Sequence, residues 1–78
     1  MILLYTTLGC HLCEQALAIT MELGLTVTEV EIADSAPLVE RYGIRIPVLA
    51  IEGSSQELGW PFSPEDVQHF LKDQTNAQ

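Results

Sequence analysis

The sequence has little positive charge, only two cysteines and no long apolar run. Its 78 residues include 3 Lys and Arg against 11 Asp and Glu, so the formal net charge is −8. Because nucleic acids and anionic membranes bind through clustered basic side chains, we expect neither as a partner. No apolar stretch approaches the roughly 20 residues of a membrane span. The first residues also lack the basic start of a signal peptide, so we expect a cytoplasmic protein.

The length leaves room for one small domain. A chain of this size buries only about 60% of its unfolded surface, which excludes a second core. Hydrophobic residues make up 47% of the sequence, an ordinary fraction for a globular protein, and this excludes wholesale disorder. We expect a single domain over residues 1–73, a polar C-terminal tail over residues 74–78, and a monomer.

Hydrophobic periodicity predicts alternating strands and helices. The expected order is a strand at 1–6, a helix from 10 ended by Gly24, a strand at 25–32, a short helix after 34–35 ended by Gly43, strands at 48–51 and 56–58, and a helix capped by Ser63 that starts at 64. A strand–helix–strand unit has parallel strands. The following hairpin and helix then give a four-stranded mixed sheet with helices packed on its faces.

Both cysteines lie where the first strand gives way to the first helix. A disulfide between Cys10 and Cys13 would close a very short loop, so it would stabilise the fold little. Side chains three residues apart at a helix start are neighbours, close to disulfide reach. The helix N-terminus favours the thiolate of Cys10, while Cys13 lies one turn further on the apolar side. We therefore expect Cys10 to attack a disulfide and Cys13 to resolve the intermediate.

Two other interpretations of the cysteine pair are a pair of buried, inert thiols and a zinc site. A structural zinc site needs two further cysteine or histidine ligands, and the only histidines are His11 and His69. His11 would point away from the flanking cysteines if this segment is helical. We therefore expect no metal. His11 is either a protonated neighbour that favours the Cys10 thiolate or an exposed spacer. Glu14, four residues after Cys10 on the same face, would act in the opposite direction.

The motif Cys10-His11-Leu12-Cys13, the Ile46–Pro47 step before the third strand and the order of elements together resemble a known family. Over roughly residues 1–71 the chain is similar to small glutaredoxin-like proteins of the thioredoxin fold superfamily. The resemblance implies an α/β, thioredoxin-like fold with helices on both faces of the sheet. It also implies that the strands lie across the sheet in the order 25–32, 1–6, 48–51, 56–58, and that the protein is a thiol–disulfide oxidoreductase.

In that family the proline is cis and faces the cysteine pair, a role that falls here on Pro47. The backbone of Ile46 would then be open to pairing with an extended substrate. His11 and Leu12, between the cysteines, are further substrate-binding candidates. Trp60 is the last candidate, and it either forms an apolar ledge beside the cysteines or covers the sheet.

The sequence departs from familiar glutaredoxins at three places. His11 stands where proline usually follows the first cysteine, residues 6–9 contain no basic residue, and residues 59–64 lack the Gly-Gly-acid step that grips glutathione. Together with the negative charge, these departures argue against glutathione as the partner. We expect no tightly bound cofactor, and protein or small-molecule disulfides as substrates. The alternative is a non-catalytic binding or redox-sensing module that docks to a basic protein.

Overall fold

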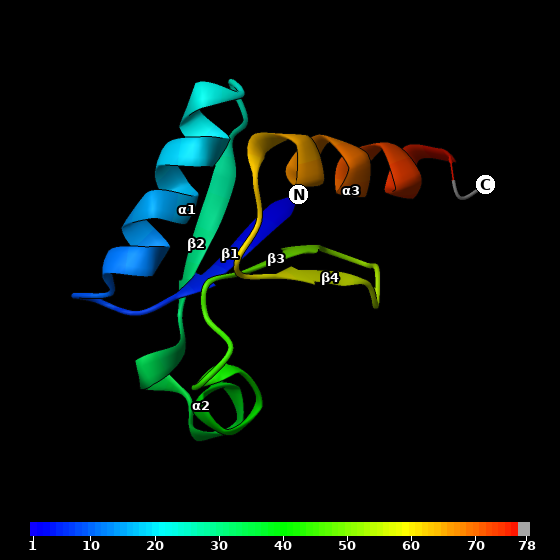
Figure 1. Ribbon diagram of the computed structural model, residues 1–78. Coiled ribbons are helices and arrows are strands. Elements are labelled where there is room, and N and C mark those ends of the chain that lie inside the picture. Colours follow the sequence, from blue (N-terminus) through cyan, green and yellow to red (C-terminus); the bar gives the residue numbers. More distant parts are fainter. Residues whose placement is uncertain (77–78) are drawn as a thin grey trace.

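The chain folds around one mixed sheet with helices on both faces (Figure 1). The computed structural model describes residues 1–76. The elements are β1 (Ile2–Thr6), α1 (His11–Glu22), β2 (Val27–Glu31), a 3₁₀ turn η1 (Ile32–Asp34), α2 (Ala36–Tyr42), β3 (Val48–Ile51), β4 (Glu57–Gly59) and α3 (Pro64–Asn76). β1 pairs in parallel with β2 and antiparallel with β3, which pairs antiparallel with β4. The resulting order, β2-β1-β3-β4, confirms the predicted topology.

Alternating side chains of the two central strands build a core on each face of the sheet. Leu4 of β1 lies opposite Leu49 of β3. Both belong to the larger cluster, whose other buried members come from α1, α3 and the segment before α3: Ala16, Phe62, Val67 and Phe70. The next residue pair, Tyr5 and Val48, faces the opposite side and packs with Tyr42 of α2. Helices α1 and α3 therefore cover one face, and α2 covers the other.

Local signals in the sequence set the ends of the helices. Gly24 follows α1 with φ 73°. Its N–H donates to the Met21 carbonyl, and the Leu25 N–H donates to the Thr20 carbonyl, which together form a Schellman motif. Before α3, the Asp66 N–H donates to the Ser63 hydroxyl and the Ser63 N–H donates to the Asp66 carboxylate. This reciprocal capping box confirms the predicted helix start.

Two predicted boundaries differ from the structure. The expected strand at 25–32 is shorter, since β2 covers only Val27–Glu31. Leu25, the first residue of the expected strand, instead donates its N–H to the Thr20 carbonyl at the end of α1. At the other end, Ile32 already belongs to η1. The last helix also runs further than its expected end, since α3 continues to Asn76 through residues 74–76 of the expected polar tail. No glycine or proline follows Pro64 to stop the helix. Residues 77–78 of the expected tail lie outside the described residues.

None of the helices within residues 1–76 combines the length and the hydropathy that a membrane-crossing helix needs.

A cluster of charged and aromatic side chains attaches α2 to β4. The Tyr42 ring stacks on Tyr5 with centroids 4.1 Å apart, and the Tyr42 hydroxyl donates to Glu57. Arg45 Nη2 lies 2.8 Å from Glu57 Oε1, and Arg41 Nη2 lies 3.6 Å from Glu57 Oε2. Burial raises the pKa of Glu57, but hydrogen bonds from Tyr42 and Arg45 and the arginine charges outweigh it, so the pKa is lowered. Two of the three basic side chains are thus engaged within the fold.

We expect Glu57→Gln to reduce the free energy of unfolding by about 1–3 kcal/mol at pH 7, because the Tyr42 and Arg45 donors lose a charged acceptor. Since the pKa of Glu57 is lowered from 4.5 in the folded state, its stabilising effect is complete above pH 4.5. The effect is lost as the pH falls through the lowered pKa. Urea unfolding at several pH values should therefore show the two curves of stability against pH converging in acid. Glu52→Gln, at an exposed turn position, is the control, and an equal loss there would contradict this role for Glu57.

Candidate active site

The two cysteines lie at the junction between β1 and α1. Between these elements the Cys10 N–H donates to the Thr7 carbonyl over 3.3 Å and closes a tight turn. Gly9 occupies the third turn position with φ 81°, a conformation that side chains other than glycine rarely adopt. Cys10 then caps α1, and its Sγ accepts the Cys13 N–H over 3.1 Å. The Cys10 sulfur therefore lies at the positive end of the helix.

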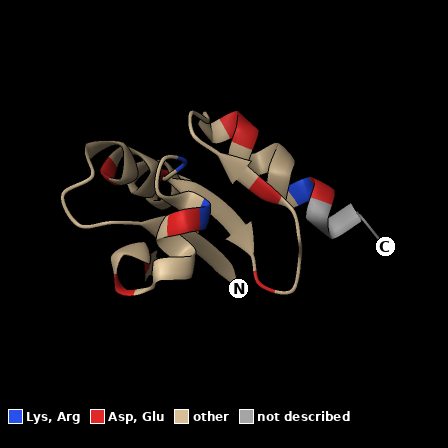
Figure 2. Ribbon diagram, turned by 90° about the horizontal axis from the view of Figure 1, so that it is seen from below, with Lys and Arg blue, Asp and Glu red and all other residues tan. Residues whose placement is uncertain are grey.

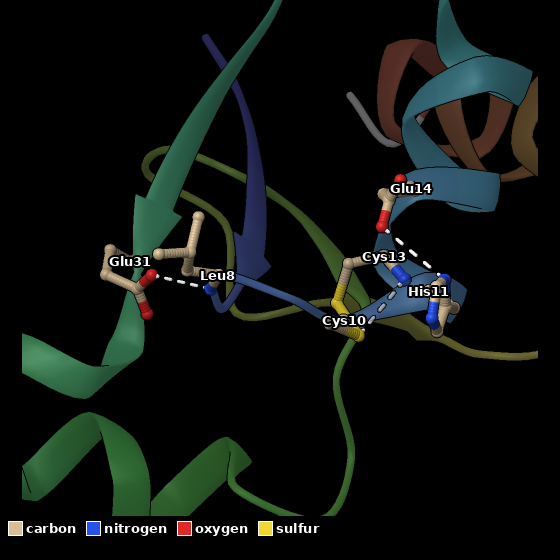
Figure 3. Close-up of a disulfide and its surroundings, with 6 residues drawn as sticks. All are labelled: Leu8, Cys10, His11, Cys13, Glu14 and Glu31. Atoms are coloured by element: carbon tan, nitrogen blue, oxygen red, sulfur yellow. Dashed lines mark hydrogen bonds and ion pairs between the residues drawn. A yellow bond between two sulfur atoms is a disulfide. The ribbon is translucent and has the colours of Figure 1, made fainter.

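Cys10 and Cys13 are joined by a disulfide, with their Cα atoms 5.2 Å apart (Figure 3). The two residues differ in exposure. Cys13 is only 3% exposed, whereas Cys10 is partly accessible to solvent. An incoming reagent can thus reach one sulfur more easily than the other. This asymmetry fits an attacking Cys10 and a resolving Cys13.

A hollow of about 540 Å³ opens beside the disulfide. Its walls come from the end of β1, the following loop, one side of α1 and the strand β2. The lining residues are Thr6, Thr7, Leu8, Gly9, Cys10, Cys13, Glu14, Leu17, Glu29 and Glu31. Three of these carry carboxylates and none is basic, so the approach to the disulfide along this side is negatively charged.

Glu31, at the end of β2, contacts the loop that precedes the cysteines. Its Oε1 accepts the Leu8 N–H over 2.8 Å and its Oε2 accepts the Ala33 N–H over 3.0 Å. The hydrogen bonds from the Ala33 N–H and then from the Thr7 side chain hold the pKa of Glu31 below its ordinary value. The folded structure therefore favours the ionised form of Glu31.

His11 and Leu12, between the cysteines, lie on the outer side of the helix start. The His11 ring is 92% exposed, and its Nδ1 lies 3.7 Å from Glu14 Oε2 (Figure 3). Leu12 is 44% exposed. Neither side chain lines the hollow, so the structure leaves both open to a partner that approaches from outside.

The remaining substrate-binding candidates, Ile46, Pro47 and Trp60, are buried or packed against the two hydrophobic cores. The Ile46–Pro47 peptide bond is cis, Pro47 is fully buried, and its carbonyl accepts the Trp60 N–H over 3.1 Å. Trp60 meets Phe62 edge to face at 5.0 Å and packs on the core under α1 and α3. Ile46 packs on the opposite core, beside Tyr42. The Trp60 ring therefore covers the sheet, and none of these three residues lines the hollow.

The sequence interpretation did not include Glu29 and Glu31 among the site residues. Both glutamates lie on β2, which runs parallel to β1, so its carboxyl end meets the same sheet edge as the loop before Cys10. The alternation of Glu29 and Glu31 with Val30 in a strand next to the cysteine-bearing connection was the available signal. Within residues 1–76 no group of three or more histidine, cysteine and acidic side chains is placed to hold a metal ion.

Comparison with known proteins relates the chain to one family. The model described as Glutaredoxin-like domain (DUF836) matches residues 1–72. The crystal structure of the structural genomics target protein XcR50 from X. campestris has a TM-score of 0.85 at 34% identity, covering 92% of this chain and 96% of that chain. The solution structure of the same target gives 0.81 at 35% identity, with 91% of each chain covered.

A glutaredoxin from Brucella melitensis is similar in fold. Its solution structure has a TM-score of 0.56 at 24% identity, covering 92% of this chain and 78% of that chain. No curated protein matches the chain.

The unequal exposure of the two sulfurs predicts unequal reactivity once the disulfide is reduced. At pH 7, the single thiol of Cys13→Ser should react with iodoacetamide at least about tenfold faster than the single thiol of Cys10→Ser, because Cys10 is accessible and lies at a helix N-terminus. Mass spectrometry of timed samples measures both rates. Similar rates in the two folded variants would contradict the assigned asymmetry.

Proposed function

Since this chain belongs to the family of glutaredoxin-like domains, we propose that it is a thiol–disulfide oxidoreductase in which Cys10 attacks and Cys13 resolves. The observation that carries the proposal is the Cys13 N–H, which donates to the Cys10 sulfur at the start of α1. After reduction, the same N–H and the helix dipole favour a thiolate on Cys10. The overall fold is thioredoxin-like, as its structural relatives show.

In the first step the Cys10 thiolate attacks one sulfur of a substrate disulfide. A bond forms between Cys10 Sγ and that sulfur, the substrate S–S bond breaks, and the other substrate sulfur leaves as a thiolate that takes a proton from water. The product is a mixed disulfide on Cys10. The partial exposure of Cys10 supports this step, because the substrate must reach its sulfur in line with the breaking bond.

In the second step Cys13 releases the substrate. Its deprotonated sulfur attacks Cys10 Sγ, the mixed disulfide breaks, and the second substrate thiolate leaves and is protonated. Two electrons have then moved from the cysteine pair to the substrate. The Cys10–Cys13 disulfide in the structure corresponds to the enzyme after this turnover. A dithiol or a reductase must return it to the reduced form.

The surroundings of the disulfide favour neutral or basic substrates over anionic ones. Acidic positions are spread over the ribbon, whereas basic positions are few (Figure 2). Glu14, Glu29 and Glu31 line the hollow beside the disulfide. Leu8 and Leu12, before and after Cys10, are 94% and 44% exposed and offer apolar contacts to a protein partner. Glutathione carries a net negative charge, so we propose a protein disulfide as the substrate.

The activity is tested by the reduction of a protein disulfide with a dithiol as electron donor. We expect turnover by the wild type and a loss of at least about 100-fold in Cys10→Ser, which lacks the nucleophile. Cys13→Ser should accumulate a mixed disulfide, visible by mass spectrometry. No turnover together with slow alkylation of both thiols would overturn the proposal. Binding of a basic partner that survives loss of both cysteines would favour the non-catalytic module.

Substrate charge gives a separate test. At low ionic strength, the reduced protein should react at least about tenfold faster with cystamine, a cationic disulfide, than with glutathione disulfide. Added salt should reduce this ratio, because it screens the carboxylates around the hollow. Glu14→Gln and Glu29→Gln should reduce it as well, with Glu65→Gln on α3 as the matched control. A ratio near one that does not change with salt would contradict the charge argument.

A further inference from the structure

The loop that leads to the cysteines is attached to β2 by one side chain. Glu31 comes 23 residues after Leu8, yet its carboxylate accepts the Leu8 N–H over 2.8 Å. Figure 3 shows the loop starting at this contact and ending at Cys10. The other carboxylate oxygen accepts the Ala33 N–H, which holds the Glu31 side chain against its own backbone. The contact therefore links the loop to the sheet edge.

The turn before α1 connects Leu8, which Glu31 contacts, to Cys10. Leu8 and Gly9 are the central residues of the turn that the Cys10 N–H closes on the Thr7 carbonyl. Cys10 is the next residue, and its place at the helix start decides whether Sγ can accept the Cys13 N–H. Gly9 makes the turn flexible by itself, since glycine has the widest choice of backbone conformations. A contact that fixes Leu8 therefore limits where Cys10 can lie.

We propose that Glu31 is a positioning residue of the redox site, which holds the Leu8 amide and thereby keeps the Cys10 sulfur within reach of the Cys13 N–H after the disulfide is reduced. The inference rests on the proposed function, in which Cys10 reacts as a thiolate. It assigns a second role to a carboxylate that also lines the hollow. Glu31 acts through Leu8 and the turn, and it does not take part in the exchange of sulfur bonds.

The positioning effect and the charge effect of Glu31 have opposite signs. A negative charge near Cys10 opposes the thiolate, so removal of the charge alone would lower the thiol pKa and speed alkylation at neutral pH. Loss of positioning would remove a hydrogen bond to the thiolate, so it would raise the pKa and slow alkylation. Glu29 offers a matched control, because it lies two residues earlier on β2 and lines the same hollow, while the Leu8 N–H donates to Glu31.

The experiment measures the rate of iodoacetamide alkylation of Cys10 against pH, in reduced protein that carries Cys13→Ser. With Glu31→Ala we expect the Cys10 pKa to rise by about one unit, which slows alkylation about tenfold at pH values below both pKa values. Glu31→Asp should act in the same direction, because its charge remains but its oxygens end one methylene short of Leu8. Glu31→Gln keeps an acceptor oxygen for the Leu8 N–H and loses the charge, and Glu29→Ala removes another carboxylate of the hollow, so both should alkylate at least as fast as the parent.

Several results would overturn the assignment. A Glu31→Ala variant that alkylates as fast as Glu29→Ala or faster would show that only the charge matters. A Glu31→Gln variant as slow as Glu31→Ala would show that the acceptor oxygen is not the relevant feature. Circular dichroism identifies any variant that has unfolded, in which case Glu31→Asp carries the comparison. Because alkylation needs no turnover, the result stands apart from the disulfide reduction assay that tests the proposed function.

Discussion

The hydrogen bond from the Cys13 N–H to the Cys10 sulfur joins the redox pair to the rest of the fold. It exists only because β1 ends in the middle of the sheet and α1 begins after one tight turn, with Gly9 in a conformation that permits the turn. The helix then supplies unpaired N–H groups at its start, and the first of the two cysteines caps it. The packing of α1 on the sheet holds this helix start in place, so the chemistry of Cys10 depends on the core beneath it.

The excess of acidic residues serves several local purposes. Glu57 attaches α2 to β4 through Tyr42 and two arginines, and Asp66 forms the capping box of α3. Glu31 holds the loop before Cys10. Each of these carboxylates has a lowered pKa because donors surround it. Part of the acidic excess behind the net charge of −8 therefore serves structural contacts. The other acidic side chains are available to influence which partners approach.

The residues expected to bind substrate and the residues that line the hollow belong to different parts of the fold. On one side lies the hollow, which β2 and its glutamates help to form. The segments at Ile46–Pro47 and Trp60 instead pack with the two cores of the sheet, on opposite faces. Strand β2, at the edge of the sheet, gives the hollow an acidic wall. The proposed preference for neutral or basic disulfides follows from that wall and from the exposed leucines beside Cys10.

Local signals in the sequence were enough to predict the order of elements, the helix ends at Gly24 and Ser63, and the cysteines at the start of α1, because each depends on periodicity, capping and spacing between near neighbours. The extension of α3 to Asn76 was missed, since a polar composition does not by itself end a helix. The contact of Glu31 with Leu8 and the hollow beside the disulfide could not be predicted, because they join residues 23 positions apart through the pairing of β1 and β2. The sequence by itself determined that both cysteines lie at the start of the first helix, and only the tertiary structure decided which carboxylates surround them, since strand register sets those distances.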